Sequence, residues 1–251
     1  MDIVITILFF IYGIVFGSFF NVVGLRVPIG ESIVKPPSHC MVCDRNLTIV
    51  DLVPVFSYLF LKGKCRGCGT KIHWMYPVME FATGLLFAFA YSQLGFSLEL
   101  IAGILFISML VIITVSDLAY MLIPNKILLF FLIPLIIVRI VSPLTLWWDS
   151  WLGAIVGFGL LFLIAVLSKG GMGGGDIKLF FVIGIVLGLI PTLLTLFLAS
   201  IIGTVFGVIA LKKAKKGRKT PIPFGPSIAI AAIISYFYGE VLVDWYVNLF
   251  F

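Results

Sequence analysis

The chain has 251 residues, of which 62% are hydrophobic and only 11% are charged, with a formal net charge of +6. A soluble domain carries about 25% charged residues, so this composition excludes a water-exposed surface, disorder and a disulfide-rich secreted scaffold. Apolar runs of about 20 residues recur without alternation, which predicts membrane-spanning helices rather than a membrane β-barrel.

The first predicted span covers residues 3–25. It is not a cleaved signal peptide, because Asp2 is the only early charge and Arg26 follows the apolar run instead of preceding it. A stripe of small residues on this helix predicts close contact with another helix. The stripe consists of Gly13, Gly17, Ser18 and Gly24.

The polar segment 26–76 contains all four cysteines as two Cys-x-x-Cys pairs: Cys40, Cys43, Cys65 and Cys68. Each pair can place two thiolates on one ion, and two pairs complete a closed, structural, tetrahedral zinc site. The distribution of Lys and Arg described below places this segment in the cytoplasm, where thiols stay reduced. A metal site is therefore favoured over disulfides, and a thiol redox pair is the alternative. His39 and His73 flank the pairs and are interpreted as surface residues, since the four cysteines already complete a ligand set.

Seven further spans are predicted, at 77–95, 99–116, 125–142, 151–168, 177–191, 192–211 and 225–245, with a turn around Pro191 between the sixth and seventh of the eight. Sixteen of the 17 Lys and Arg residues then fall on one face, and only Arg139 lies near the other. The positive-inside rule makes that face cytoplasmic and places both termini outside. The basic cluster at 212–219 is interpreted as a loop near anionic lipid rather than a nucleic-acid site.

Three acidic residues fall at the cytoplasmic ends of predicted spans: Glu80, Asp117 and Asp176. Carboxylates at this depth are costly unless they face a wet cavity or a partner, so functional use is the default interpretation. Asp176 would also suit a helix N-cap, where the helix dipole favours negative charge. The glycine run before it leaves backbone groups free to pair with an extended peptide. This run includes Gly173, Gly174 and Gly175.

Two carboxylates at matched depth can share one proton and polarise a water molecule, one acting as base and the other as acid. Hydrolysis of a peptide bond fits this arrangement, because the sequence has no G-x-S-x-G elbow, no H-E-x-x-H motif and no histidine inside a predicted span. A proton- or cation-coupled transporter would also use intramembrane acids, and the acids alone leave that alternative open.

Gly173-Gly174-Gly175-Asp176 matches the G-x-G-D motif of intramembrane aspartyl proteases. Beyond this motif, the chain resembles the bacterial type IV prepilin peptidases (prepilin leader peptidase/N-methyltransferases) along nearly its whole length. A presenilin-like protease of general membrane helices would share G-x-G-D but not the four-cysteine loop. The matching stretches are 17–23, 26–28, 36–40, 51–58, the second cysteine pair, 76–80, Asp117 with 123–125, and 221–226.

The resemblance implies that Asp117 and Asp176 are the catalytic aspartates. They would remove the leader of prepilins, or of pseudopilins of secretion and competence systems, after a glycine. It also implies methylation of the new N-terminal residue with S-adenosylmethionine, an activity associated with the four-cysteine region, although no motif locates the donor site. Lys178 is interpreted either as a partner of Asp176 or of a substrate acid, or as an interfacial lysine.

Two positions depart from the family pattern. Met75 stands where many relatives have arginine, which puts a polar contact near Glu80 in doubt. Met41 stands inside the first cysteine pair, where relatives often have proline, and it leaves the thiolate spacing unaffected.

We therefore predict an all-α, polytopic membrane bundle of about eight transmembrane helices with a small zinc-knuckle cytoplasmic loop. Residues 1–25 are the first helix, 26–76 the methyltransferase-associated loop, and 77–251 the membrane-embedded aspartyl peptidase domain, which Glu80, Lys178 and the glycine run support. The predicted location is the bacterial cytoplasmic (plasma) membrane, with the active site and the loop on the cytoplasmic side. The predicted partners are a pilin precursor and the lipid bilayer, without nucleic acid, and no oligomeric state is predicted.

Overall fold

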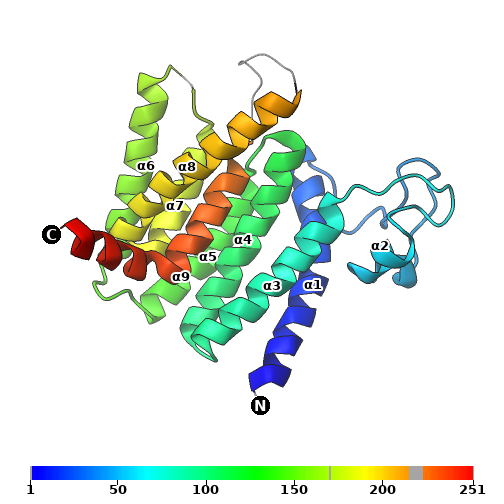
Figure 1. Ribbon diagram of the computed structural model, residues 1–251, viewed down its shortest axis with the longest axis horizontal. Coiled ribbons are helices and arrows are strands. Elements are labelled where there is room, and N and C mark those ends of the chain that lie inside the picture. The colour runs from blue at the N-terminus through cyan, green and yellow to red at the C-terminus, as the bar shows by residue number, and fades with distance from the viewer. Residues whose placement is uncertain (1, 170, 215–222, 251) are drawn as a thin grey trace. The chain divides into compact units, whose positions relative to one another are not determined.

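The computed structural model describes residues 2–169, 171–214 and 223–250 (Figure 1). This part of the chain forms nine α-helices and two short 3-10 helices, and its only β-type pairing is a pair of isolated bridges. The prediction of an all-α protein is confirmed. Gly170 and the basic positions 215–219 lie outside the described residues. The chain divides into two compact units, Met1–Leu100 and Ile101–Phe251, called here the N-terminal and C-terminal units.

In the N-terminal unit, α1 (Asp2–Arg26) packs along α3 (Met75–Leu94). A Cβ atom added to Gly13 would lie 2.7 Å from the Cα of Gly84, and one added to Gly17 would lie 2.8 Å from the Cα of Glu80. The two backbones therefore touch, which confirms the close contact predicted from the small-residue stripe at these two positions. The loop between the helices contains η1 (Val27–Ile29), η2 (Ile49–Leu52) and α2 (Phe56–Phe60).

The C-terminal unit is built around α7, which packs against α5, α6, α8 and α9. Nearly every side chain of α7 from Ile177 to Leu187 is buried, as expected for a helix that is apolar on all sides. The helices are α4 (Leu98–Tyr120, which begins at the boundary between the units), α5 (Asn125–Val141), α6 (Asp149–Leu167), α7 (Gly174–Leu187), α8 (Leu189–Ala214) and α9 (Gly225–Phe250).

The chain breaks between α7 and α8 at Gly188, which adopts a φ of +80°. The predicted turn around Pro191 is therefore misplaced. A glycine in a left-handed conformation ends the helix earlier, and Pro191 is tolerated in the first turn of α8. Arg139 donates from Nε and Nη2 to the carbonyl oxygen of Val186, at 3.0 and 2.7 Å. The Oδ1 of Asp149 accepts the N–H of Leu189 at 3.1 Å. The two helix ends at the break thus gain hydrogen-bond partners from neighbouring helices.

Each of the eight predicted spans overlaps mainly one helix, and five of these described helices are long and apolar enough to cross a membrane: α1, α4, α6, α8 and α9. α5 and α7 have 17 and 14 residues, and α3 is long enough but less apolar. The chain is therefore a multi-pass membrane protein, and the number eight for the spans stays a prediction.

Candidate active site and metal centre

Asp117 lies in the last turn of α4 and is buried, with 6% of its surface exposed. Its Oδ2 atom accepts the backbone N–H of Gly225, the first residue of α9, at 2.7 Å. A Cβ atom on Gly225 would lie 2.8 Å from the same oxygen, so only glycine lets α9 begin this close to the carboxylate. The positive end of the α9 dipole also favours negative charge here.

Asp176 is the third residue of α7, and Gly173 is the N-cap. The aspartate N–H donates to the carbonyl oxygen of Gly173 at 3.1 Å, while its carboxylate accepts the N–H of Gly173. Asp176 is therefore not the N-cap considered from the sequence, since it reaches back to the cap from the first turn, as an acid does in a capping box. This contact fixes the carboxylate at the start of the helix.

The two aspartates are brought together by contacts between α7 and the turn that follows α4. A Cβ atom on Gly175 would lie 2.7 Å from the Cβ of Ile123 in that turn, so the glycine permits close docking of α7. Asp117 and Asp176 lie within range of an electrostatic interaction with each other. The structure thus places the two aspartates near each other in the C-terminal unit, and their role as a catalytic pair stays a prediction.

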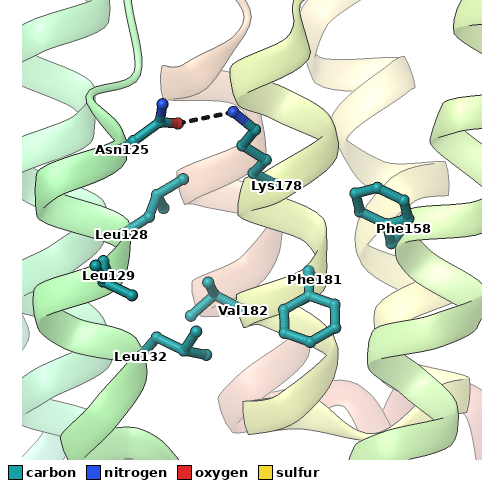
Figure 2. A pocket seen from close by; sticks show the side chains of 8 residues that line it. All are labelled: Asn125, Leu128, Leu129, Leu132, Phe158, Lys178, Phe181 and Val182. Atoms are coloured by element: carbon teal, nitrogen blue, oxygen red, sulfur yellow. Dashed lines mark hydrogen bonds between the residues drawn. The ribbon is translucent and has the colours of Figure 1, made fainter.

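Lys178 is exposed, and its Nζ donates to Oδ1 of Asn125 at 3.0 Å. Among the described residues it forms no salt bridge with Asp176, contrary to one of the alternatives for this lysine. The bond joins the second turn of α7 to the first residue of α5 and closes one end of a groove of about 430 Å³ (Figure 2). The walls of the groove are apolar and consist of Leu128, Leu129, Leu132, Phe158, Phe181 and Val182.

Glu80 is buried in the N-terminal unit, in the second turn of α3. Its Oε2 atom accepts the backbone N–H of Val55 at 2.7 Å, and its carboxylate also bonds to the side chain of Ser18. The carboxylate therefore ties the cysteine-containing loop to both α1 and α3. Its predicted role in supporting the active site stays a prediction.

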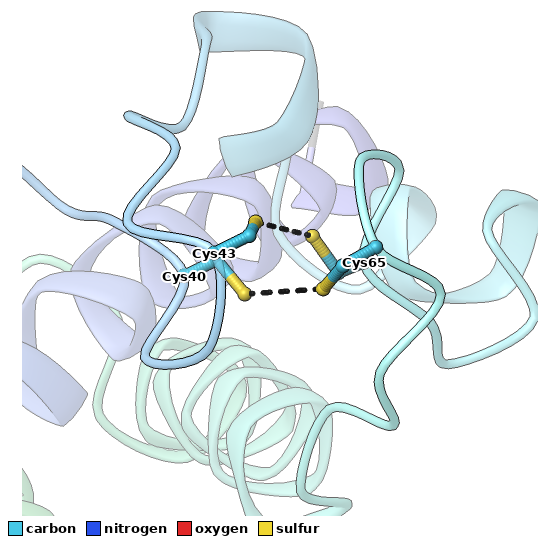
Figure 3. Close-up of side chains that lie close together, drawn as sticks. Cys40, Cys43 and Cys65 are labelled. Atoms are coloured by element: carbon cyan, nitrogen blue, oxygen red, sulfur yellow. Dashed lines mark hydrogen bonds between the residues drawn. The ribbon is translucent and has the colours of Figure 1, made fainter.

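The four cysteines form one cluster, in which all the sulfur atoms lie within 4.8 Å of one another. The Sγ atoms of Cys40 and Cys68 are 3.7 Å apart, and those of Cys43 and Cys65 are 4.0 Å apart (Figure 3). A tetrahedral zinc ion with Zn–S bonds of about 2.3 Å needs sulfur atoms about 3.8 Å apart, whereas a disulfide needs about 2.05 Å. All four thiols are free, and the donor set fits a metal ion. Neither His39 nor His73 belongs to the cluster.

A buried carboxylate joins the two Cys-x-x-Cys turns, called here the first knuckle (Cys40–Cys43) and the second knuckle (Cys65–Cys68). The Oδ2 of Asp51 lies 2.7 Å from Nη2 of Arg45, which follows the first pair, and its Oδ1 lies 3.0 Å from Nε of Arg66, inside the second pair. The side chain of Asp51 is only 3% exposed. The pKa of Asp51 is held below its usual range by the backbone N–H of Thr48, and then by the Thr48 hydroxyl and the two guanidinium groups. The carboxylate of this arrangement, called here the Asp51 clamp, is therefore ionised at neutral pH.

Known proteins match both units. Residues 11–94 match the Bacterial Peptidase A24 N-terminal domain, and residues 104–208 match the Type IV leader peptidase family. A prepilin leader peptidase/N-methyltransferase of Bacillus subtilis (strain 168) is 45% identical over 240 residues, which cover 96% of this chain and 97% of the relative. The chain belongs to the type IV leader peptidase family.

Other members of the type IV leader peptidase family are similar over comparable lengths. Proteins with the same name from Aeromonas salmonicida (strain A449) and Xanthomonas campestris pv. campestris are 30% and 33% identical, over 96% and 94% of this chain and 93% and 92% of theirs. No solved structure matches the chain.

In this leader peptidase family member, sequence reasoning missed three residues that shape the two sites. Gly225, Asn125 and Asp51 all lie in stretches that resemble the family, but they received no role from the sequence. Their position in those stretches was the only signal that could have indicated a role. Gly225 acts through its backbone N–H, Asn125 accepts a bond from Lys178, and Asp51 binds two arginines, and none of these contacts has a local sequence motif.

Proposed function

We propose that Asp117 and Asp176 hydrolyse the peptide bond that joins the leader of a type IV prepilin or pseudopilin to its mature chain. The observation that carries this proposal is that the buried Asp117 and the half-buried Asp176 lie near each other in a chain of this family. By the family resemblance, the bond that is cut follows a glycine and precedes an apolar pilin helix.

The chemistry follows from a shared proton. One aspartate, as carboxylate, takes a proton from a water molecule while the water oxygen attacks the carbonyl carbon of the leader glycine. The other, protonated, donates its proton to the carbonyl oxygen. When the tetrahedral intermediate breaks down, the C–N bond breaks and a proton passes to the departing amine. Gly225 and Gly173 each hold one carboxylate with a backbone N–H, so the pair is oriented before substrate arrives.

The glycine run supports an extended substrate in this proposal. Gly173 and Gly174 are exposed, and nothing lies within 4 Å of the position that a Cβ of Gly174 would take. A peptide backbone can therefore approach this segment closely, while Gly175 docks α7 on its neighbour. Lys178, which bonds to Asn125, follows this segment two residues after Asp176.

We further propose that the four cysteines hold a structural zinc ion and that the enzyme also methylates the new N-terminus of the pilin. S-adenosylmethionine, when bound, supplies the methyl group for that second activity. The zinc ligands Cys40, Cys43, Cys65 and Cys68 leave no open coordination position, so the ion would organise the loop rather than take part in hydrolysis. We assign no residue to the methyl donor.

The proposed location is the bacterial cytoplasmic membrane, with the aspartates and the cysteine loop on the cytoplasmic side. The distribution of Lys and Arg residues supports this orientation.

The test is to incubate the purified, reconstituted protein with a pilin precursor, with and without S-adenosylmethionine, and to measure the masses of the products. We expect loss of the leader in both reactions and a methyl increment only with the donor. An uncut precursor, together with proton or cation flux in proteoliposomes, would overturn the proposal in favour of a transporter. Cutting of unrelated membrane helices at equal rates would instead indicate a general intramembrane protease.

A further inference from the structure

The segment Ile49–Phe60, between the two cysteine knuckles, carries apolar side chains that neither proposed activity uses. Ile49 is 86% exposed and Phe60 is 83% exposed, and Val50, Phe56 and Leu59 are also exposed. So many exposed large apolar side chains within twelve residues are unusual on a water-facing surface and indicate a binding partner or a membrane.

The short helix α2 shows which side of this segment faces outward. Phe56, Leu59 and Phe60 are spaced i, i+3 and i+4, so they lie on one face, and this face is the exposed one. Tyr58 is half-buried, and a Cβ on Gly63 would lie 2.9 Å from Cζ of its ring. α2 is therefore attached to the second knuckle with its apolar face turned away from it.

A hydrogen bond sets the depth of α2 relative to α1. The N–H of Val55, immediately before α2, donates to Glu80, and the backbone at Glu80 lies against Gly17 of α1. Gly17 lies nine residues before the end of α1, a distance of about 13 Å along the helix. α1 is one of the candidate membrane spans, so α2 begins beside the span and not beyond its end (Figure 1).

The backbone turns tightly at Val55, immediately before α2. Val55 has a φ of +63°, rare for a β-branched residue, and the N–H of Phe56 donates to the carbonyl oxygen of Pro54 at 2.6 Å in a tight γ-turn. Such a turn persists only where surrounding contacts hold it, and the bond to Glu80 is one such contact.

We propose that Ile49–Phe60 is an interfacial membrane anchor that lies in the leaflet next to the cysteine loop, with Phe56, Leu59 and Phe60 among the lipid acyl chains. The exposed Lys62 and Lys64, which follow α2 directly, contact anionic headgroups. The anchor fixes the metal knuckles at the membrane surface. This inference depends on the membrane helices and not on the proposed peptidase activity.

The experiment places the photoreactive residue p-benzoylphenylalanine at Phe60 of the full chain, reconstituted in vesicles of phosphatidylethanolamine and phosphatidylglycerol with a pilin precursor present. After irradiation, we expect an intact mass increased by one phospholipid. The control is the same replacement at Met41, which is 86% exposed on the first knuckle and outside the anchor, and there we expect no lipid adduct. Absence of lipid at position 60, equal lipid yields at both positions, or a peptide adduct at position 60 would overturn the proposal.

A second measurement addresses the anchor without photochemistry. The triple variant Phe56→Ser, Leu59→Ser, Phe60→Ser removes the apolar face but none of the four cysteines. We expect it to keep its metal stoichiometry while trypsin cuts after Lys62 and Lys64 several-fold faster in vesicles. Unchanged cutting in a variant that retains its metal would contradict a lipid-embedded α2.

Discussion

The four-cysteine cluster and the aspartate pair are assembled in opposite ways. Each knuckle takes two ligands from four consecutive residues and closes on itself, with Cys40 N–H bonded to the carbonyl of Arg45 and Cys65 N–H to that of Thr70. The aspartates instead come from two separate helices, and their approach depends on contacts made by other residues. The cysteine cluster is therefore a local structure that a metal ion can stabilise, whereas the proximity of the aspartates is a product of helix packing.

The largest effect is expected for the proposed catalytic pair. Asp117→Asn and Asp176→Asn should each reduce cleavage of a pilin precursor by at least roughly a thousandfold, because an amide cannot exchange the proton that the reaction needs. Cleavage is measured by product mass under single-turnover conditions. The metal content should stay that of the wild type, since the cluster lies in the other unit. A variant that processes the precursor at the normal rate would remove the proposed mechanism.

The next prediction concerns the four-cysteine cluster. Cys40→Ser should release the bound metal, because a neutral hydroxyl is a poor replacement for a thiolate ligand, and methylation should fall more than cleavage. Metal per chain is measured by atomic emission. Met41→Ser, at an exposed neighbour in the same turn, serves as the control and should retain the metal. Full metal content in Cys40→Ser would refute the zinc assignment.

For Asp51, which links the two knuckles, we expect an effect of intermediate size on metal affinity. Asp51→Asn removes the charge that faces Arg45 and Arg66 and should weaken metal affinity by about 10–100-fold, the range for residues that support metal ligands. Affinity is measured by competition with a chelator. Asp44→Asn, at an exposed position with a φ of +52° that asparagine tolerates, is the matched control. Equal affinities in the two variants would show that Asp51 does not couple the knuckles.

The smallest effect concerns helix docking. Gly175→Ala places a methyl group against Ile123 and should destabilise the C-terminal unit by about 1–3 kcal/mol, as overpacking does. Gly174→Ala, one residue away and facing open space, should leave the thermal unfolding midpoint unchanged. Both midpoints are measured in the same detergent. If the two variants unfold at the same temperature, close docking at Gly175 does not hold α7 in place.

The two regions also differed in how far the sequence could predict them. The cysteine cluster was predicted in full, because ligand type and spacing within four residues determine it. The two aspartates were predicted as a pair, but their supports were not. The N–H of Gly225 reaches Asp117 across more than a hundred positions, and a backbone donor is the same in every residue except proline.

Arg139 shows that the prediction of topology from charge is limited in a similar way. It was the one basic residue that did not follow the charge asymmetry, and its burial against Val186 explains why: it bonds to a helix end instead of lying in a loop. A count of charges by position cannot separate these two uses of arginine. The end of α7 was misplaced for a related reason, since proline was a stronger local signal than the glycine three residues earlier.

The break at Gly188 has a consequence for how the protein is made. The 14 residues of α7 extend about 21 Å, less than the roughly 30 Å of the hydrocarbon core. Arg139 and Asp149, which satisfy the backbone on either side of the break, belong to helices that the ribosome has already completed. We therefore expect α7 and α8 to insert together as a hairpin, into a site that α5 and α6 have prepared.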